Sequence, residues 1–491
     1  MLSLGDKMTI AIAAMLIGVL ALEATMLGTM YQHTFMTSPS NPAGAATGAN
    51  QLTGISAINT MSAKLPPSLG AQAAGSSLSV VETPAQAFQD AFSRARVSTP
   101  FVLFDSTTVY GLNTNLWETL AGGTGTSSFT PGQSALVIST GGTASSASFV
   151  RQTSYYTIYQ PGRSQLVYMT FAMGTARTNS ESNVGYYDAS DGIFFQRATD
   201  SAGTSTLYVA QRSSVSGSVV TTKVAQSAWN LDPLDGTGSS GVTLDISKAQ
   251  ILVIDLQWLG VGRVRIGFDI DGVLYYVHQF LNANSETGVY MSSATLPGRY
   301  EVRNTGTSSG ILTMQSICAG ILSEGGELTS TVNQFSTQSE SVTVADGTFT
   351  PMISLRLRDL IFTSNQRNHC QMYLRSVQVE NDDSATGLVY SIFVNPTTLT
   401  GASFSNYDSS LSIVQVDTSA TAVAGGTSIA SGLTPASLLG VGATSELPFD
   451  RLRPFVYHAL NDEADVVTIA AKGNGGAVSA IAAINWIEIC A

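Results

Sequence analysis

The sequence has few charged residues for its length. Only 11% of its 491 residues are Asp, Glu, Lys or Arg, about half of the usual share. Acidic residues outnumber basic ones by 34 to 22, the net charge is -12, and no Lys- or Arg-rich run occurs. A nucleic-acid binder needs a clustered basic face, so nucleic acid is excluded as the expected partner. A surface of Ser, Thr, Asn and Gln suits packing against other subunits, and we expect a homo-oligomer. A secreted β-protein is the alternative.

Cysteine and histidine are also scarce. The three cysteines, Cys318, Cys370 and Cys490, are too widely spaced for a zinc site. Cys318 and Cys490 lie in apolar contexts and are expected to be buried free thiols, and the odd count leaves at least one thiol unpaired or intermolecular. The four histidines are far apart in the chain. His278 is predicted to be a hydrogen-bonded histidine on a sheet face.

Recognisable catalytic motifs are missing as well. The sequence contains no P-loop, no HExxH and no Glu-x-Asp-x-x-Glu strand of the glycosidase kind. The stretch GTGSSG at 236–241 matches the dinucleotide-binding fingerprint, and GTSSG at 306–310 matches the nucleophile elbow of hydrolases. Neither stretch is expected to lie between a strand and a helix, where these motifs function. We therefore assign no catalytic residue, no cofactor-binding residue and no metal ligand, and we expect that the protein is not an enzyme.

What the sequence does contain is a strongly patterned stretch at 229–306. Residues 251–258 form an almost unbroken apolar run, and residues 263–270 alternate between apolar and polar, which is the period of a half-buried strand. Asp271-Gly272 is a two-residue hairpin signal, and residues 273–280 form the return strand. Three antiparallel strands make a meander, whose apolar face needs a second sheet to cover it.

The alternation also assigns faces. Trp258 is expected inside the sandwich, on the face that it shares with Leu252, Ile254 and Leu256. Arg263 and Arg265 are expected on the outer face, where replacing either with alanine would cost well under about 1 kcal/mol.

Similar short strands, separated by Gly, Ser, Thr and Asp turns, recur to the end of the chain. The fold class predicted is mainly β, with two jelly-roll-like β-sandwich domains at 97–325 and 326–491. The last apolar stretch, at 484–489, is predicted to be a buried strand that closes the chain.

The N-terminal part differs in composition. Residues 1–37 contain an apolar segment at 8–31, which approaches the length of a membrane-spanning helix. It is interpreted as a membrane anchor, as a helix buried in an oligomeric stalk or capsid shell, or as an uncleaved signal. Residues 38–96 form a low-charge arm, with an amphipathic helix predicted at 83–96.

The central region resembles a known family. The stretches DGTGSSGVTLD, QILVIDLQWLGVGRVRIGF and LPGRYEVRNTG are similar to a concanavalin-like jelly-roll domain in virion proteins of tailed phages and large DNA viruses. The resemblance covers roughly 100–325. It implies a virion structural protein, such as a minor capsid or spike-type component, located in the virion with other capsid proteins as partners. It also favours a trimer.

Two alternatives use the same architecture: a carbohydrate-binding host-attachment protein and a cell-surface glycan hydrolase. Aromatic side chains stack on sugar rings, although they also fill sandwich cores. The candidate glycan contacts are Tyr155, Tyr156, Tyr186, Tyr187 and Trp229.

Carboxylate pairs at turns are a further candidate feature. A calcium ion bound by oxygen ligands is possible there, but the spacing fits no defined calcium loop, and turn residues that bond their own backbone are the alternative. The pairs are Asp188 with Asp191, Asp232 with Asp235, and Asp269 with Asp271.

Overall fold

The computed structural model describes residues 89–490 apart from 92, 97–98, 326–332, 362–365, 384, 437–442 and 450–452. The predicted anchor at 8–31 and most of the arm lie outside the described residues. Among those that are described, no helix is long and apolar enough to cross a membrane.

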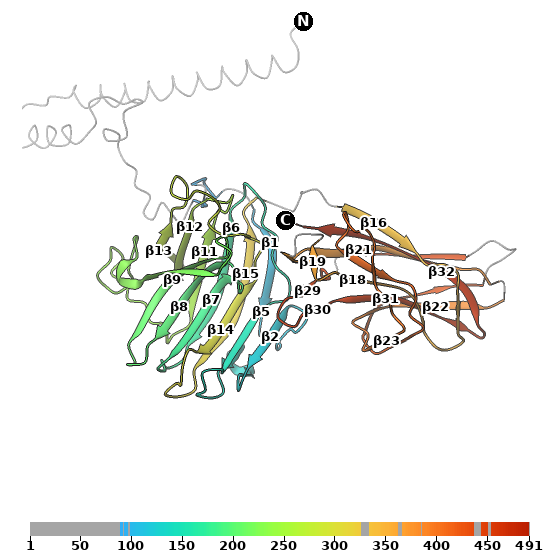
Figure 1. Ribbon diagram of the computed structural model, residues 1–491, viewed down its shortest axis with the longest axis horizontal. Helices are drawn as coiled ribbons and strands as arrows, with labels where there is room; N and C mark the ends of the chain where they lie inside the picture. The colour runs from blue at the N-terminus through green and yellow to red at the C-terminus, as the bar shows by residue number, and fades with distance from the viewer. Residues whose placement is uncertain are drawn as a thin grey trace, which may run out of the picture. The chain divides into compact units, whose positions relative to one another are not determined.

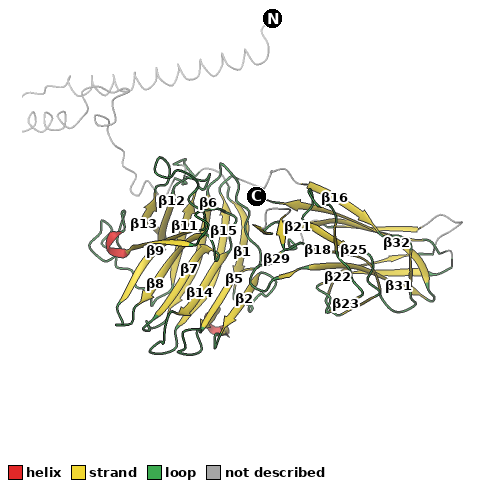
Figure 2. Ribbon diagram, viewed as in Figure 1, coloured by secondary structure: helices red, strands yellow, loops and turns green. Residues whose placement is uncertain are grey.

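The described part of the chain consists of strands and loops (Figure 2). Its only helical elements are two single turns of 3-10 helix, η1 (Pro131–Gln133) and η2 (Gln226–Ala228). The prediction of a mainly β fold with jelly-roll-like sandwiches is confirmed.

The first sandwich is built from two antiparallel sheets (Figure 1). The eight-stranded sheet has the order β13-β12-β11-β6-β15-β4-β3, and β1 also pairs with β15. Its strands are β1 (Phe101–Thr107), β3 (Thr126–Thr130), β4 (Ala135–Ser139), β6 (Gln165–Met173), β11 (Gln250–Leu256), β12 (Val264–Ile270), β13 (Val273–Phe280) and β15 (Thr313–Ser323). The seven-stranded sheet has the order β10-β9-β8-β7-β14-β5-β2. Its strands are β2 (Trp117–Gly122), β5 (Ser148–Thr153), β7 (Ser180–Tyr187), β8 (Gly192–Thr199), β9 (Ser205–Ser213), β10 (Val220–Ala225) and β14 (Gly298–Asn304).

The predicted meander is present in this sandwich. Strand β11 pairs with β12 and β12 with β13, and Asp271 and Gly272 form the turn with φ of 56° and 80°. Leu252, Ile254 and Leu256 are fully buried in the core that both sheets share. Contacts such as the edge-to-face pair of Phe195 and Phe268, whose ring centroids are 5.2 Å apart, join the two sheets. Trp258 lies beyond the end of β11 and is only partly buried, at the margin of this core.

The second sandwich also has two sheets. The five-stranded sheet has the order β16-β32-β21-β28, with β17 pairing β32, and the six-stranded sheet has the order β24-β25-β18-β31-β22-β27. The first contains β16 (Asn333–Gln338), β17 (Val342–Val344), β21 (Gln371–Asn381), β28 (Ala443–Pro448) and β32 (Val478–Ile489). The second contains β18 (Thr350–Leu357), β22 (Gly387–Val394), β24 (Ser405–Asn406), β25 (Val414–Asp417), β27 (Thr427–Thr434) and β31 (Val466–Asn474). Three small hairpins complete it: β19 (Leu360–Ile361) with β20 (Gln366–Arg367), β23 (Thr398–Thr400) with β26 (Ala422–Ala424), and β29 (Tyr457–His458) with β30 (Glu463–Ala464).

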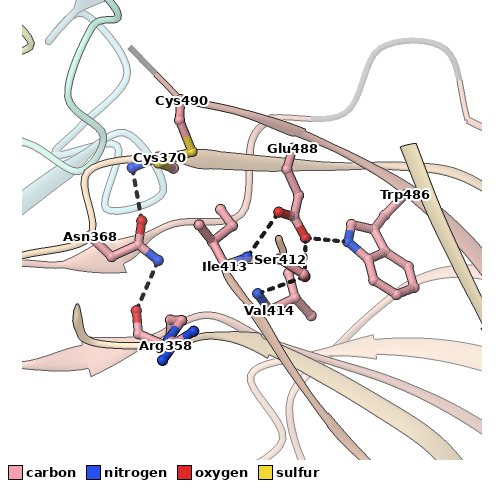
Figure 3. The surroundings of a disulfide bond; sticks show 9 residues. All are labelled: Arg358, Asn368, Cys370, Ser412, Ile413, Val414, Trp486, Glu488 and Cys490. Atoms are coloured by element: carbon pink, nitrogen blue, oxygen red, sulfur yellow. Dashed lines mark hydrogen bonds between the residues drawn. A yellow bond between two sulfur atoms is a disulfide. The ribbon is translucent and has the colours of Figure 1, made fainter. Parts of the chain in front are cut away.

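The last strand, β32, is at the centre of the second sandwich. Its residues alternate, so that Ala480, Ala482, Ile484 and Trp486 are fully buried. This confirms the predicted buried closing strand. The buried Glu488 carboxylate on β32 accepts bonds from Trp486 Nε1 at 2.8 Å and from the Ile413 amide at 2.9 Å (Figure 3).

A disulfide joins Cys370 to Cys490, between the start of β21 and the end of β32 (Figure 3). The prediction that Cys490 is a free thiol is therefore wrong, because antiparallel pairing of β21 with β32 brings two cysteines that are 120 residues apart into bonding distance. Cys318 is free and only partly buried.

Residues 89–96 also differ from expectation. In the described positions they form a turn with a bridge between Gln89 and Ala95, in place of the predicted amphipathic helix. The turn lies against the outer face of the eight-stranded sheet, where Arg263 Nε donates to the Ala91 carbonyl at 3.2 Å and Arg265 Nη2 to the Gln89 carbonyl at 2.6 Å. These tertiary contacts override the local helix preference.

This turn changes the environment of the outer-face arginines. Arg265 forms an ion pair with the fully buried Asp255, whose carboxylate also accepts bonds from Arg96 at 2.6 Å and from the Tyr276 hydroxyl at 2.8 Å. Arg265 is itself fully buried. The face was predicted correctly, but the expectation that Arg265 is dispensable is wrong, because residues 89–96 cover that face.

Replacing Arg265 with alanine should therefore destabilise the protein by about 3 kcal/mol, because a buried carboxylate would lose a charged partner. Arg263→Ala is the matched control and should cost about 1 kcal/mol or less, since it loses two hydrogen bonds at a partly exposed site. Urea unfolding of both variants tests this. Equal losses would show that residues 89–96 do not bury Arg265.

Replacing Cys370 with serine should cost about 2–5 kcal/mol by releasing a long closed loop in the unfolded chain. Cys318→Ser, which breaks no disulfide, should stay within about 0.5 kcal/mol. Thermal unfolding with and without reductant measures both. A wild-type protein insensitive to reductant would contradict the disulfide.

Candidate functional site

The outer face of the seven-stranded sheet carries a polar network. Arg303 Nε donates to Glu181 at 2.8 Å, and Lys223 lies 3.2 Å from the same carboxylate. Arg299 donates to Glu301 at 3.0 Å. Burial alone would raise the pKa of Glu301, but Arg299 and Arg303 more than offset it and hold that pKa below its usual value. Because the Glu181 and Glu301 carboxylates are both buried and paired with cations, this part of the face is not open to a ligand.

The network continues to the edge of the sheet. Arg299 Nη1 donates to Gln152 at 3.2 Å, and Gln152 Nε2 donates to Glu118 at 2.7 Å. Glu118 lies on the edge strand β2, and its second oxygen accepts a bond from the Leu460 amide of the second sandwich at 3.3 Å. The polar row of the first sandwich thus ends where the second sandwich begins.

A cleft of about 880 Å³ opens at this seam. One wall comes from β2 and the residues before it. The other comes from the hairpin of β29 and β30, with residues of β18, β25 and β31 and neighbouring loops of the second sandwich. Most of the lining side chains are polar, with Trp117 and Tyr457 as the aromatic ones. The polar lining residues include Glu118, Arg356, Asp359, Asn395, Gln415, His458, Asn461, Asp462 and Glu463.

The hairpin is held by the buried carboxylate of Asp465, directly after β30. It accepts bonds from Arg453 Nη1 at 2.9 Å, from Asn395 Nδ2 at 2.8 Å and from the Val456 amide at 3.2 Å. Burial opposes ionisation, but His458 and Arg453 hold the pKa of Asp465 well below its usual range. Asp465 is therefore a charged anchor that fixes the cleft wall.

His458 lies between two carboxylates from different sandwiches. Its Nε2 is 3.3 Å from Asp465 Oδ1, and its Nδ1 is 3.8 Å from Glu118 Oε2. Burial lowers the pKa of His458, but Asp465 and Glu118 more than offset that effect, so the pKa is raised. Burial raises the pKa of Glu118, and its bond from Gln152 and the charge of His458 only partly counteract this.

The pKa of Asp462, in contrast to that of Glu118, is lowered. Its carboxylate accepts bonds from the Tyr457 hydroxyl at 2.7 Å and from Arg367, and both lower its pKa. The cleft therefore contains one carboxyl group that favours its protonated form and one that favours its ionised form.

The five candidate glycan contacts lie elsewhere. Tyr156, Tyr186, Tyr187 and Trp229 are buried, and Tyr155 is partly buried against the first core. The Tyr186 hydroxyl donates to the Ala294 carbonyl at 2.8 Å, and the indole nitrogen of Trp229 donates to the Val224 carbonyl at 3.1 Å. These rings pack within the protein in this structure, and their proposed contact with a glycan stays a prediction.

Among the carboxylates at turns, Asp188 and Asp232 bond to the backbone of their own turns, whereas Asp191 accepts bonds from the distant Ser214 and Ser292. Asp188 Oδ1 accepts bonds from the amides of Ser190 and Asp191 at 2.7 and 2.8 Å, and Asp232 Oδ1 from the Leu234 amide at 2.9 Å. Within the described residues, no group of three His, Cys, Asp or Glu side chains is placed to hold a metal ion, so the calcium alternative gains no site there.

Sequence reasoning missed the residues of the cleft. Residues 458–465 read HALNDEAD, in which four of eight side chains are titratable, although only 11% of the whole chain is charged. That local concentration was the available signal. Tyr110 was also missed. It is 99% exposed, in the loop between β1 and β2 that brings Thr114 to the cleft.

No protein-family model and no curated protein matches the chain. Solved structures that resemble it include a glycosyl hydrolase family 16 protein from Mycobacterium smegmatis, at 11% identity, 45% of this chain, 100% of that chain and a TM-score of 0.30. A Bacillus licheniformis beta-glucanase follows at 12% identity, 46% and 98% coverage and a TM-score of 0.27. A legume lectin-like domain from Entamoeba histolytica has 7% identity, 46% and 98% coverage and a TM-score of 0.28.

These TM-scores are too low to define the fold, which rests on the strand pairing of this chain in two β-sandwiches. The prediction that the protein is not an enzyme is contradicted, because several of these solved structures are glycosyl hydrolases, and we withdraw it. At such low similarity the likeness transfers no activity and no catalytic residue to this chain.

Asp465→Asn should destabilise the protein by about 3–5 kcal/mol at pH 7, because Arg453 would lose its buried partner. A depressed folded pKa contributes stability above the ordinary aspartate value and loses it as pH falls, so the difference from wild type should shrink at pH 3. Urea unfolding at both pH values measures this. The exposed Asp462→Asn variant is the control. A difference that grows in acid would contradict the ionised anchor.

Proposed function

We propose that the protein binds carbohydrate, with the cleft between β2 and the β29–β30 hairpin as its sugar site. A volume of about 880 Å³ accommodates a short oligosaccharide and is within the usual range for ligand pockets. Amides, carboxylates and a histidine together supply the donors and acceptors that sugar hydroxyls require. The two aromatic lining residues, Trp117 and Tyr457, are only 5% and 7% exposed, so recognition in this site relies on the polar side chains.

The proposal rests on the fact that one set of cleft residues fixes the wall while another set is exposed to a ligand. Asn395 and Arg453 both donate to Asp465 and hold the wall. Three other polar residues are exposed on that wall: Asp359, Asn461 and Glu463. A rigid wall that presents polar side chains to solvent is pre-organised for a polar ligand, since little order has to be gained on binding.

We further propose that the carbohydrate is a host glycan and that the chain is a virion attachment protein. The virion location, the trimer and the other virion proteins as partners rest on the sequence resemblance. The Cys370–Cys490 disulfide agrees with an oxidising setting, such as the outside of a particle, because cytosolic proteins rarely keep disulfides.

A second candidate function is glycan hydrolysis in the same cleft. Glu118, with its raised pKa, would donate a proton to the glycosidic oxygen, and Asp462, with its lowered pKa, would act as the base that activates water. The contrast between these two groups is the observation that favours this candidate.

Binding can be tested with purified protein on a glycan array, followed by titration of the strongest array glycan. Asn461→Ala and Glu463→Ala should each weaken binding about tenfold, the effect of losing one or two hydrogen bonds. Gln378→Ala, exposed on β21 away from the cleft, should bind like wild type. Unchanged affinity in both cleft variants would overturn the site, and a blank array would overturn glycan binding.

Hydrolysis can be tested by incubating the array-positive glycan with protein and measuring new reducing ends. If the cleft is catalytic, Glu118→Gln should lower the rate at least about 100-fold, the usual contribution of a general acid. The control is Glu286→Gln, an exposed glutamate in the loop after β13. Product formation at the same rate by Glu118→Gln would remove Glu118 from the chemistry.

A further inference from the structure

Polar contacts between described residues join the two sandwiches at two places. Gln371 Nε2 donates to the Tyr156 carbonyl at 2.8 Å, and the His369 ring stacks on the Tyr156 ring with centroids 3.8 Å apart. The other contacts converge on Glu118, which accepts the Leu460 amide and faces His458. The cleft lies beside this second group, so its two walls are connected through Glu118.

His458 is placed to connect three elements. Glu118 is on β2 of the first sandwich, whereas Asp465 and His458 belong to the second. Asp465 is fixed by Arg453 and Asn395, so it cannot follow His458 if the imidazole moves. With a proton on each ring nitrogen, His458 can attract both carboxylates at once, and without the second proton it can donate to only one of them.

We propose that protonated His458 is a clasp that locks the two walls of the cleft together, so that the site holds its glycan when the clasp is closed and releases it when the proton is lost. The glycan part of this inference rests on the proposed function. The clasp itself is a property of the seam and is present without ligand.

The charged neighbours define the pH range. The groups facing His458 are Glu118, Asp465 and Arg453, and Asp462 and Glu463 are on the same hairpin. A raised histidine pKa means that His458 is fully protonated below the ordinary value of about 6.5 and loses its second proton as pH rises through the raised value. In acid, protonation of Glu118, whose pKa is also raised, removes the other partner. The clasp is therefore closed in an intermediate range and opens at both ends.

His369, the other histidine of the seam, titrates in a different way. Burial against Tyr156 lowers its pKa, so it is neutral throughout the range in which His458 gains and loses its proton. His278 is in the first sandwich, and burial lowers its pKa to about 4. Both therefore serve as controls.

The test is hydrogen exchange of the Leu460 amide, which bonds to Glu118 across the seam. After correction for the intrinsic rate, ligand-free wild-type protein should lose about tenfold or more of its protection between pH 6.5 and pH 9. His458→Gln should show low protection without this step, and His458→Lys, which stays charged, should keep its protection at pH 9. His369→Gln and His278→Gln should keep the wild-type step.

A step that persists in His458→Gln, or that disappears in His369→Gln, would overturn the clasp. Repeating the glycan array at pH 6.5 and pH 9 tests the regulation separately. Wild type should lose signal at pH 9 and His458→Lys should retain it. If exchange shows the clasp but the array signal does not depend on pH, only the role of the clasp in glycan release is overturned. A blank array would refute glycan binding without affecting the exchange result.

Discussion

A buried charge must be paired, and this constraint determines how the separate pieces of this chain fit together. The chain has few charges, but many of them are buried in specific contacts. Asp255 pairs with Arg265 and Arg96 and thereby fixes residues 89–96 on the first sandwich. Asp465 pairs with Arg453 and fixes the β29–β30 hairpin on the second. Removing one partner from such a pair costs more than any single surface contact supplies.

The same constraint distinguishes the two polar regions of the seven-stranded sheet. Glu181 and Glu301 are each paired with arginine, so their charges are already neutralised within the sheet face. Glu118, at the edge, is bonded to an amide and a backbone N–H and faces a histidine, whereas the cation Arg299 bonds to Gln152 and acts on Glu118 only through its charge. The ionisation of Glu118 can therefore change with pH, and the proposed clasp depends on this property.

Local pattern predicted the strands well. Three features appear as expected: the alternation at 263–270, the Asp271-Gly272 turn and the closing strand at 484–489. Each could be predicted because hydrophobic periodicity and turn preference depend only on neighbouring residues. The predictions that were wrong concern residues whose environment is set by contacts distant in sequence. Arg265 looked exposed because nothing in its own strand predicts that residues 89–96 cover it. Likewise, Cys370 and Cys490 are joined only by the pairing of β21 with β32. The cleft combines residues near 118 with residues 457–464, and one sequence without topology could not bring them together.

The account depends most on where a sugar binds. A crystal structure of the protein with the oligosaccharide that binds most strongly on the array tests this directly. If the proposed site is right, ligand density lies between β2 and the β29–β30 hairpin, with hydrogen bonds to Asn461 and Glu463. Density on the outer face of the seven-stranded sheet, or at any other place with the cleft empty, would contradict it.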